Sequence, residues 1–315
     1  MYYPYFRAKQ YEMLALRSFI QSNANDTITY PILEPVKASF NSLRLLLNAY
    51  RDAKKPIGII LNPEVGDMVN KREQIEAELS DYQNVYTPVF IINYLNIETI
   101  KKIILDSRYQ EVIILAPNPL PGNGDTLIEL MSLPTVKTLI IREPIRSLRR
   151  RVHEKEKKIV ILHDCFNKQE RNAKYIDISE ELFSEEYWYY SEEGYDGISD
   201  YTVLPSAYIE GGRLPYAIAI HLTYQKEKQV QLRHFVSDSN DDDSNIQGKF
   251  EEAAKKAVSF CNENHLISQG IKELKNYLLT EHYPGLGALK KISILNHLEL
   301  VSIIFSLKNK HKNSL

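Results

Sequence analysis

Polar side chains that could bind a ligand close six apolar stretches of this sequence. Each stretch has the length of a β-strand, and most of the closing residues stand beside a proline. Carboxylates, amides and imidazoles can hold a metal ion, transfer a proton or bind a polar small molecule. The closing residues lie roughly 20 to 31 positions apart, and they are Glu34, Asn62, Asn93, Asn118, Glu143 and the neighbours His163 and Asp164.

One chemistry for these residues is metal-assisted hydrolysis. Glu34, Glu143 and Asp164 could supply the hard oxygen ligands that Mg²⁺ or Ca²⁺ prefers. His163 could then act as a general base if a carboxylate orients its ring. A metal-dependent phosphodiesterase or hydrolase is therefore one hypothesis for the function.

The other chemistry is the binding of an anionic or phosphorylated small molecule at the same strand ends. Such a pocket would also include Arg142, Asp200 and His221, which follow or lie within neighbouring apolar stretches. A simpler explanation stays open beside both hypotheses. Polar residues end many barrel strands because the chain must return to solvent there.

The spacing of the apolar stretches predicts a repeated strand–helix unit. Each gap is compatible with a helix, and the stretches are too apolar to alternate, as in strands covered on both faces of a parallel sheet. Two further strands, over 198–204 and 217–224, would bring the number to eight. Eight units favour a TIM-like (β/α) barrel over an open doubly wound sheet, with all the polar strand ends on one face.

The whole chain, 1–315, is predicted to form a single barrel-like domain. Residues 1–27 would be an N-terminal helical segment, 28–236 the strand–helix units with a terminal hairpin, and 249–308 a cap of C-terminal helices. The hairpin, in LPYAIAIHLTY and QVQLRHFVSD, would make the last strands irregular, because a regular barrel has none. In the final helix we expect Leu295, Leu298 and Ile304 to be buried in the fold rather than in lipid.

Composition argues against several classes of protein. The net charge of −2 argues against a general nucleic-acid binder. The apolar run ISILNHLELVSIIFSL is short for a membrane span and contains polar residues, so we expect no membrane span. The start, MYYPYFRAKQYE, has neither a basic leader nor an apolar core, so we expect no signal peptide. Two cysteines cannot form a disulfide framework, which favours a cytoplasmic protein.

Two further segments are unusual in composition. The chain has 21 Tyr against 10 Phe, with clusters in YYPYFRAKQY and EEYWYYSEEGYDGISDY that could close one end of the barrel or form a contact surface. The acidic stretch DSNDDDSN begins like a calcium loop at Asp238, Asn240 and Asp242. Asp243 stands where that loop needs glycine, and Lys249 stands in place of the bidentate glutamate, so the motif fails.

Several stretches resemble a known family. The opening YPYFRAKQYEMLAL with ITYPILEPVK is similar to the start of the bacterial and phage "beta protein" family, and GISDYTVLP, AIAIHLTY, LRHFVSD and YPGLGALKKISILNHLEL resemble signatures of one subgroup. The resemblance covers nearly the whole chain. It implies a barrel-like α/β fold and an occurrence in mobile-element or phage-defence neighbourhoods, but no established catalytic residues.

The positions matched by this resemblance form a second set of candidate ligand-binding residues. The subgroup has two adjacent histidines where this chain has Asn296 and His297, so the resemblance does not require both imidazoles. The matched positions are Arg7, Lys9, Glu12, Glu34, Asp200, His221, His234, Lys290, Lys291 and His297.

Three functions follow from these observations. The leading hypothesis is a barrel protein that binds a phosphorylated small molecule, or a companion protein from the same gene neighbourhood, as one component of a defence-type system. The alternative is the metal-dependent phosphodiesterase or hydrolase. The third is a structural interaction module that uses its tyrosine clusters. The sequence does not identify a cofactor, and it is compatible with a homo-oligomer.

Overall fold

The computed structural model describes residues 1–120, 124–211 and 215–312, except for the side chains of 309–312. The chain divides into two compact units, each built from three separate segments. The barrel unit comprises Met1–Lys9, Thr27–Asp164 and Tyr189–Asp200. The second unit comprises Gln10–Asp26, Cys165–Trp188 and Tyr201–Leu315.

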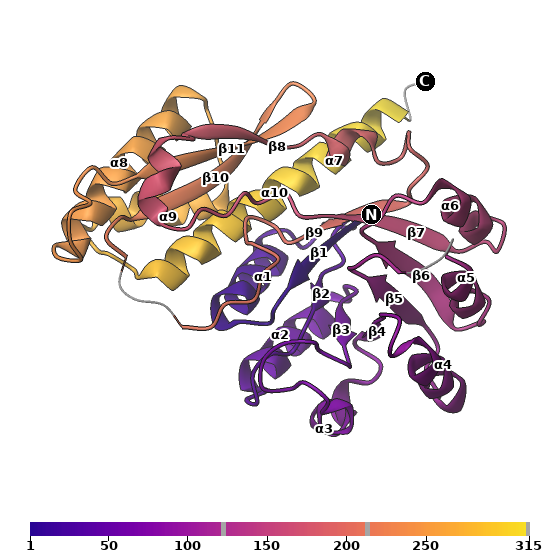
Figure 1. Cartoon of the computed structure of the whole chain (residues 1–315). Coiled ribbons are helices and arrows are strands. Elements are labelled where there is room, and N and C mark those ends of the chain that lie inside the picture. The colour runs from indigo at the N-terminus through magenta and orange to yellow at the C-terminus, as the bar shows by residue number, and fades with distance from the viewer. Residues whose placement is uncertain (121–123, 212–214, 313–315) are drawn as a thin grey trace. The chain divides into compact units, whose positions relative to one another are not determined.

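Eight parallel strands form a closed barrel in the first unit, which confirms the prediction of a TIM-like α/β barrel (Figure 1). The strands follow one another around the barrel in chain order, and the last pairs with the first. They are β1 (Tyr2–Phe6), β2 (Ile32–Leu33), β3 (Gly58–Ile60), β4 (Thr87–Ile91), β5 (Val112–Ala116), β6 (Val136–Ile141), β7 (Lys158–His163) and β9 (Gly197–Asp200).

Helices cover the outside of this barrel (Figure 1). They are α2 (Asn41–Ala53), α3 (Arg72–Glu78), the 3₁₀-helix η1 (Ser80–Tyr82), α4 (Ile97–Asp106), α5 (Asp125–Met131) and α6 (Arg146–His153). In α2 the buried residues Leu43, Leu46, Leu47 and Tyr50 repeat at helical spacing and form one face. The strands need apolar residues on both faces, because one face fills the barrel and the other meets the helices. All five residues of β5 are accordingly buried.

The first barrel strand is Tyr2–Phe6, which the sequence interpretation had placed in a helical segment over 1–27. Only Gln10–Ser22 is helical there, as α1, and it belongs to the second unit. All five residues of β1 are buried, so no polar alternation indicates a strand, and Pro4 has no N–H for a ladder hydrogen bond. The expectation that 217–224 is a barrel strand is correspondingly wrong, because β1 takes the eighth place.

Tyr3 of the first tyrosine cluster packs at the N-terminal ends of the barrel strands. The rings of Tyr3 and Tyr30 stack with their centroids 5.2 Å apart. The Tyr30 hydroxyl donates a hydrogen bond of 2.5 Å to Oγ1 of Thr87, the first residue of β4. Tyr3 and Tyr30 therefore help to fill this end of the barrel, whereas the hydroxyls of Tyr2 and Tyr5 in the same cluster reach Asp200 and Glu34 at the C-terminal strand ends.

The second unit contains a separate three-stranded antiparallel sheet in the order β10–β11–β8. The predicted hairpin is confirmed as β10 (Ala219–Lys226) and β11 (Gln229–Val236), and β8 (Glu180–Ser184) pairs with β11. Apolar residues of the sheet share a core with three helices. These are α8 (Ile246–Glu263), α9 (Gln269–Leu279) and α10 (Leu286–Lys312), and the unit also includes the 3₁₀-helix η2 (Asn172–Ile176). The short helix α7 spans Glu186–Tyr189.

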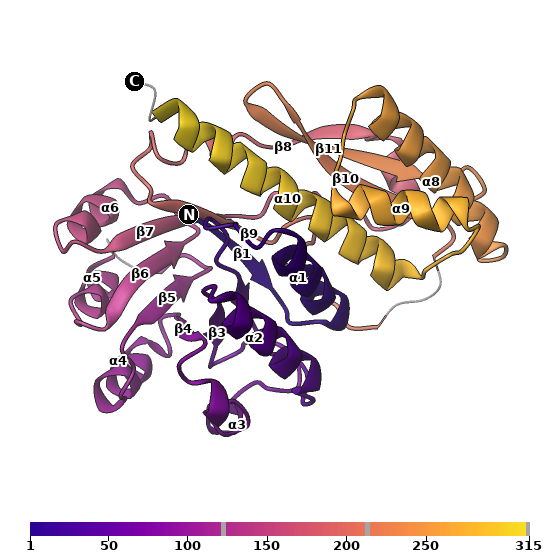
Figure 2. The same ribbon diagram turned by 180° about the vertical axis from the view of Figure 1, so that it is seen from behind.

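The C-terminal helix α10 lies beside α1 within the second unit (Figure 2). Hydrogen bonds link the two segments, from Asn23 Nδ2 to Glu299 Oε1 at 3.1 Å and from Ser302 Oγ to Asp26 Oδ1 at 2.7 Å. Leu295, Leu298 and Ile304 have no exposed surface, as predicted, so they are core residues of the fold. Among the described residues, no helix combines the length and apolar character that crossing a membrane requires.

Candidate functional site

The six polar strand ends lie at one end of the barrel, as the sequence predicts. Each of the corresponding strands is parallel to its neighbours, so their C-terminal ends point the same way. We call this end the barrel mouth. It carries Glu34, Asn62, Asn93, Asn118, Glu143, His163 and Asp164, together with Arg7 after β1, Arg142 after β6 and Asp200 at the end of β9.

Glu34 forms a buried ion pair at the barrel mouth. Its carboxylate contacts the Arg7 guanidinium directly and accepts a hydrogen bond of 2.5 Å from the Tyr5 hydroxyl. The other carboxylate oxygen accepts the backbone N–H of Glu64 at 2.7 Å. The Glu34 side chain is 0 % exposed and that of Arg7 is 18 % exposed. The structure therefore provides the basic partner that we expected for Glu34.

The sequence predicts Glu34 as a ligand-binding residue, but its side chain has no exposed surface and so does not itself line a solvent-reachable pocket. Burial of a carboxylate is costly unless it is paired and hydrogen-bonded, and Arg7, Tyr5 and the Glu64 amide meet that need. A role of Glu34 in ligand binding stays a prediction. In this arrangement it would act by holding Arg7 in place.

Two of the three asparagines at the barrel mouth, Asn62 and Asn93, hold the backbone in place. Asn62 bridges to β4, since its Nδ2 donates to the Ile91 carbonyl at 2.7 Å and its Oδ1 accepts the Ile91 N–H at 2.9 Å. Asn93 Oδ1 accepts the backbone N–H groups of Leu95 and Asn96 at the start of α4. Both residues have the structural role that the simpler explanation of polar strand ends expects. Asn93 Nδ2 also reaches Glu64 Oε1 at 3.2 Å.

A second, weaker ion pair lies at the ends of β6 and β7. Arg142 Nη2 is 3.5 Å from Asp164 Oδ2, with the two side chains 45 % and 20 % exposed. Such a long and partly exposed pair contributes little to stability. Glu143 is exposed and, among the described residues, makes no side-chain hydrogen bond.

His163 is the most unusual group at the barrel mouth. It ends β7 and lies opposite Asp200 in the pairing of β7 with β9. Its Nε2 atom is buried and has no hydrogen-bond partner among the described residues. Burial lowers the pKa of His163, while Asp200 opposes the shift and Arg142 adds to it. Asp200 is itself fully buried and accepts a hydrogen bond of 2.8 Å from the Tyr2 hydroxyl.

The structure does not assemble the metal centre of the alternative hypothesis. Within the described part of the chain, no group of three or more His, Cys, Asp or Glu side chains is arranged to hold a metal ion. Glu34 is committed to Arg7, and Asp164 lies beside Arg142. The geometry of Glu34, Glu143, His163 and Asp164 therefore gives the hydrolase hypothesis no support.

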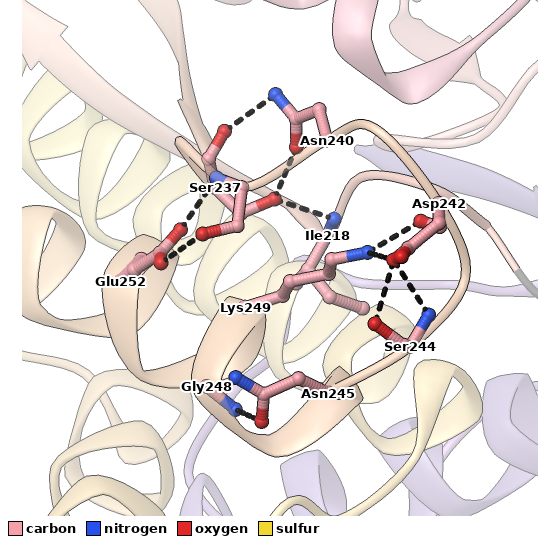
Figure 3. Close-up of polar contacts among 10 residues, drawn as sticks. Ile218, Ser237, Asn240, Asp242, Ser244, Asn245, Gly248, Lys249 and Glu252 are labelled. Atoms are coloured by element: carbon pink, nitrogen blue, oxygen red, sulfur yellow. Dashed lines mark hydrogen bonds and ion pairs between the residues drawn. The ribbon is translucent and has the colours of Figure 1, made fainter.

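In the acidic loop before α8, Lys249 contacts Asp242, a residue of the failed calcium-loop motif (Figure 3). Lys249 is 2 % exposed, and its Nζ donates to the backbone carbonyl of Asp242 at 2.5 Å and lies 3.4 Å from its Oδ1. Asp242 also accepts hydrogen bonds from Ser244, and Asn245 caps α8. Lys249 and Lys256, which pairs with Asp238 at 2.7 Å, thus place two positive charges against this acidic loop.

In the second unit, the matched residues His221 and His234 face each other across the hairpin. Their Nδ1 atoms are 2.7 Å apart, and His234 Nε2 is 3.1 Å from Glu181 Oε1 on β8. The rings of Phe166 and Tyr175 contact this pair, with Tyr175 4.7 Å from the His221 ring centroid and 4.5 Å from that of His234. Burial, the neighbouring His234 and the charge of Lys290 lower the pKa of His221 to about 3.

The other matched residues of the second unit are separate from this pair. His297 is fully buried, with Nε2 3.2 Å from the Tyr187 hydroxyl and Nδ1 3.1 Å from Thr223 Oγ1. It is therefore part of the packing of α10 against the sheet. Glu12 is buried on α1, and Lys290 is exposed on α10. Lys9 belongs to the barrel unit, where it is partly buried.

Sequence reasoning missed the groups that position these candidates. Tyr2 and Tyr5 lie on β1, so recognising that strand would have placed their hydroxyls among the barrel residues. Glu64 contributes through its backbone N–H, which no side-chain pattern can reveal. Glu181 lies on a short strand with only two apolar residues, and nothing in the sequence connects it with His234.

The barrel mouth and the histidine pair are thus two separate groupings of the predicted site residues. The resemblance to the beta protein family stays a prediction. No known family model matches the chain, and no curated protein has a matching sequence.

Proposed function

We propose that the barrel unit binds a small phosphorylated molecule at the barrel mouth. The observation that carries the proposal is the buried Nε2 atom of His163, which has no hydrogen-bond partner among the described residues. Buried polar atoms are nearly always hydrogen-bonded, to protein, water or ligand. A ligand group that exchanges a hydrogen bond with this imidazole would satisfy it, and the lowered pKa keeps the ring neutral near pH 7.

Arg142 is the group that would contact the phosphate. Its separation from Asp164 is 3.5 Å and its side chain is 45 % exposed, so a phosphate can replace this carboxylate at little cost. Arginine suits the task because its planar guanidinium donates two parallel hydrogen bonds to a phosphate. The charge of Arg142 also lowers the pKa of His163, so the two side chains are close enough to interact electrostatically.

Arg7 would border the site and keep its ion pair with Glu34. Its ion pair is largely buried, and separating it would leave an unpaired carboxylate inside the barrel. A ligand would therefore contact Arg142 and His163 before it could compete for Arg7. We assign ligand contact to Arg142 and a supporting role to Arg7 because the Arg142–Asp164 pair is more exposed than the Arg7–Glu34 pair.

The wider role in this proposal is that of a ligand-binding component of a phage-defence or mobile-element system. It rests on the resemblance to the beta protein family alone. A companion protein from the same gene neighbourhood would respond to the bound state of the barrel. Loss of phage protection in cells that carry ligand-site variants together with the neighbouring genes tests this part.

Calorimetry and thermal unfolding with ribose 5-phosphate, glucose 6-phosphate and AMP test the binding. At least one of these probes should stabilise the full chain, because a ligand that binds only the folded state raises stability with its concentration. The uncharged sugars ribose and glucose should not. Arg142→Met and His163→Phe should abolish the stabilisation.

Arg51→Met is the matched control. Arg51 lies on α2 of the same unit, its side chain is 54 % exposed, and it makes a similarly loose contact of 3.3 Å with Asp52. This variant should bind the phosphorylated probe normally. The proposal is refuted if none of the three probes stabilises the chain, or if Arg142→Met and Arg51→Met behave alike.

A further inference from the structure

A chain of hydrogen bonds connects Glu181, His234 and His221 in the second unit. Glu181 lies on β8, His234 on β11 and His221 on β10, and the antiparallel register places the two histidines directly opposite each other. His234 has a side-chain exposure of 0 %, while His221 is partly exposed. Among the described residues, His221 Nε2 has no hydrogen-bond partner, so it forms the open end of the chain.

The three contacts fix which nitrogen carries each proton. An ionised carboxylate only accepts hydrogen bonds, so His234 Nε2 donates to Glu181. In a neutral His234 the Nδ1 atom is then an acceptor, and His221 Nδ1 must donate across the 2.7 Å contact. His221 Nε2 is left with a lone pair. When both histidines are neutral, the hydrogen-bonded series therefore presents an acceptor, His221 Nε2, at its open end.

One added proton converts His221 Nε2, the open end of this hydrogen-bonded series, from a hydrogen-bond acceptor to a donor. A proton that binds His221 Nε2 allows the Nδ1 proton of His221 to pass to His234 Nδ1. His234 is then the imidazolium and lies against the Glu181 carboxylate, while His221 is neutral and presents an Nε2–H donor. The positive charge then lies against the Glu181 carboxylate, which raises the pKa of His234, whereas burial of the ring lowers that pKa by more.

The surroundings favour an anion at this end. Lys290 lies on α10 next to Leu289, which shares a buried core cluster with Ile220, the neighbour of His221 on β10. Lys290 is exposed, its charge lowers the pKa of His221, and its ammonium has no ion pair or hydrogen bond among the described residues. The other titratable group that faces the pair is Tyr175 of η2. On the opposite face of the sheet, α8 packs through apolar residues against Ile220 and Leu222.

We infer that His221 and Lys290 form a proton-linked binding site for a small oxyanion, with Glu181 and His234 as the relay that stores the proton. The anion would accept hydrogen bonds from Lys290 and from the Nε2–H of His221. Its charge offsets that of Lys290, which is one of the groups that oppose protonation of the histidines. Anion binding and proton uptake therefore favour each other. This site lies in the second unit and does not depend on ligand binding at the barrel mouth.

Titrations of the full chain with sodium sulfate test the site. Sulfate does not titrate in the range used, and sodium chloride of equal ionic strength is the reference. The ring signals of His221 and His234 are followed by NMR with labelled histidine, at about pH 8, 7 and 6. The histidine pair without an anion is neutral in this range, because the pKa of His221 is lowered to about 3. Sulfate should therefore bind more tightly as the pH falls below the pKa of the anion-bound pair, by up to about tenfold per pH unit for an uptake of one proton. A parallel titration with acetate distinguishes a carboxylate ligand from a tetrahedral oxyanion.

Three variants separate the roles of the residues. Lys290→Met, a surface change, should abolish the response to sulfate, and His221→Gln should remove the pH dependence. Lys255→Met changes an exposed lysine on α8 and should bind as the unmodified chain does. Arg142→Met should also leave this site unchanged, because Arg142 belongs to the barrel mouth. An affinity that is the same at all three pH values overturns the inference, as does a normal response of Lys290→Met or the absence of binding by both sulfate and acetate.

Discussion

Replacing Glu34 by Gln tests the buried ion pair at the barrel mouth. Glutamine keeps the shape of the side chain but removes the charge that faces Arg7. The change should lower the stability of the fold, because the carboxylate is fully buried and accepts hydrogen bonds from Arg7, the Tyr5 hydroxyl and the Glu64 amide.

The size of the effect follows from these contacts. The introduced glutamine amide would have one acceptor oxygen and one NH₂ donor, whereas the site offers donors on both sides. If the oxygen faces the Glu64 N–H, the NH₂ group faces the Arg7 guanidinium. Removing one partner of a buried ion pair costs about 3–5 kcal/mol. The same range applies here, and it is a large part of the roughly 5–15 kcal/mol that stabilises a typical fold.

Urea unfolding followed by circular dichroism measures this cost. The midpoint should fall while its denaturant dependence stays constant, which indicates a change of stability rather than of the unfolded state. Glu78→Gln is the matched control, since Glu78 pairs with Arg44 on the surface with side chains 36 % and 37 % exposed. The control should cost no more than about 1 kcal/mol.

A double-mutant cycle with Arg7→Met isolates the pair itself. The combined variant should be less destabilised than the sum of the two single variants, because the second change removes a charge that has already lost this partner. The reasoning is refuted if Glu34→Gln costs less than about 1 kcal/mol, or no more than Glu78→Gln.

Three further predictions concern packing, backbone and pH. Leu298→Ala should cost about 2–5 kcal/mol in urea unfolding, because Leu298 is fully buried in α10, and a cost below about 0.5 kcal/mol would contradict its core position. Gly66→Ala should destabilise the fold more than Gly285→Ala: both have a left-handed backbone, but a Cβ at Gly66 would lie 2.3 Å from the Val36 carbonyl oxygen, and at Gly285 it meets nothing within 4 Å. Equal melting temperatures of the two variants would exclude this steric cost. The pKa of His221 is lowered to about 3 from an unfolded value near 6.5, so the unfolded chain binds more protons between these values. Stability should fall as the pH drops through this window, by up to about 1.4 kcal/mol per pH unit, and His221→Gln should flatten that slope in acid-unfolding curves. A slope that His221→Gln leaves unchanged would rule out this histidine as its cause.

The strand–helix repeat and the common end of the polar residues could be predicted from sequence, because both depend on local pattern. A buried parallel strand is an apolar run, and a polar residue marks its end. These rules located the residues from Glu34 to His163 at the barrel mouth. The same rules missed β1, whose run of buried tyrosines around Pro4 matches neither alternation nor an aliphatic run.

Only the tertiary structure decides which candidates meet. Arg7 and Glu34 are 27 positions apart, and Tyr2 and Asp200 are 198 apart, so their contacts require closure of the barrel around β1. The register of the hairpin places His221 opposite His234, and the pairing of β8 with β11 brings Glu181 to His234. Sequence alone determined that these side chains are polar and near strand ends. Their burial, their partners and hence their charges depend on long-range packing, which no local pattern encodes.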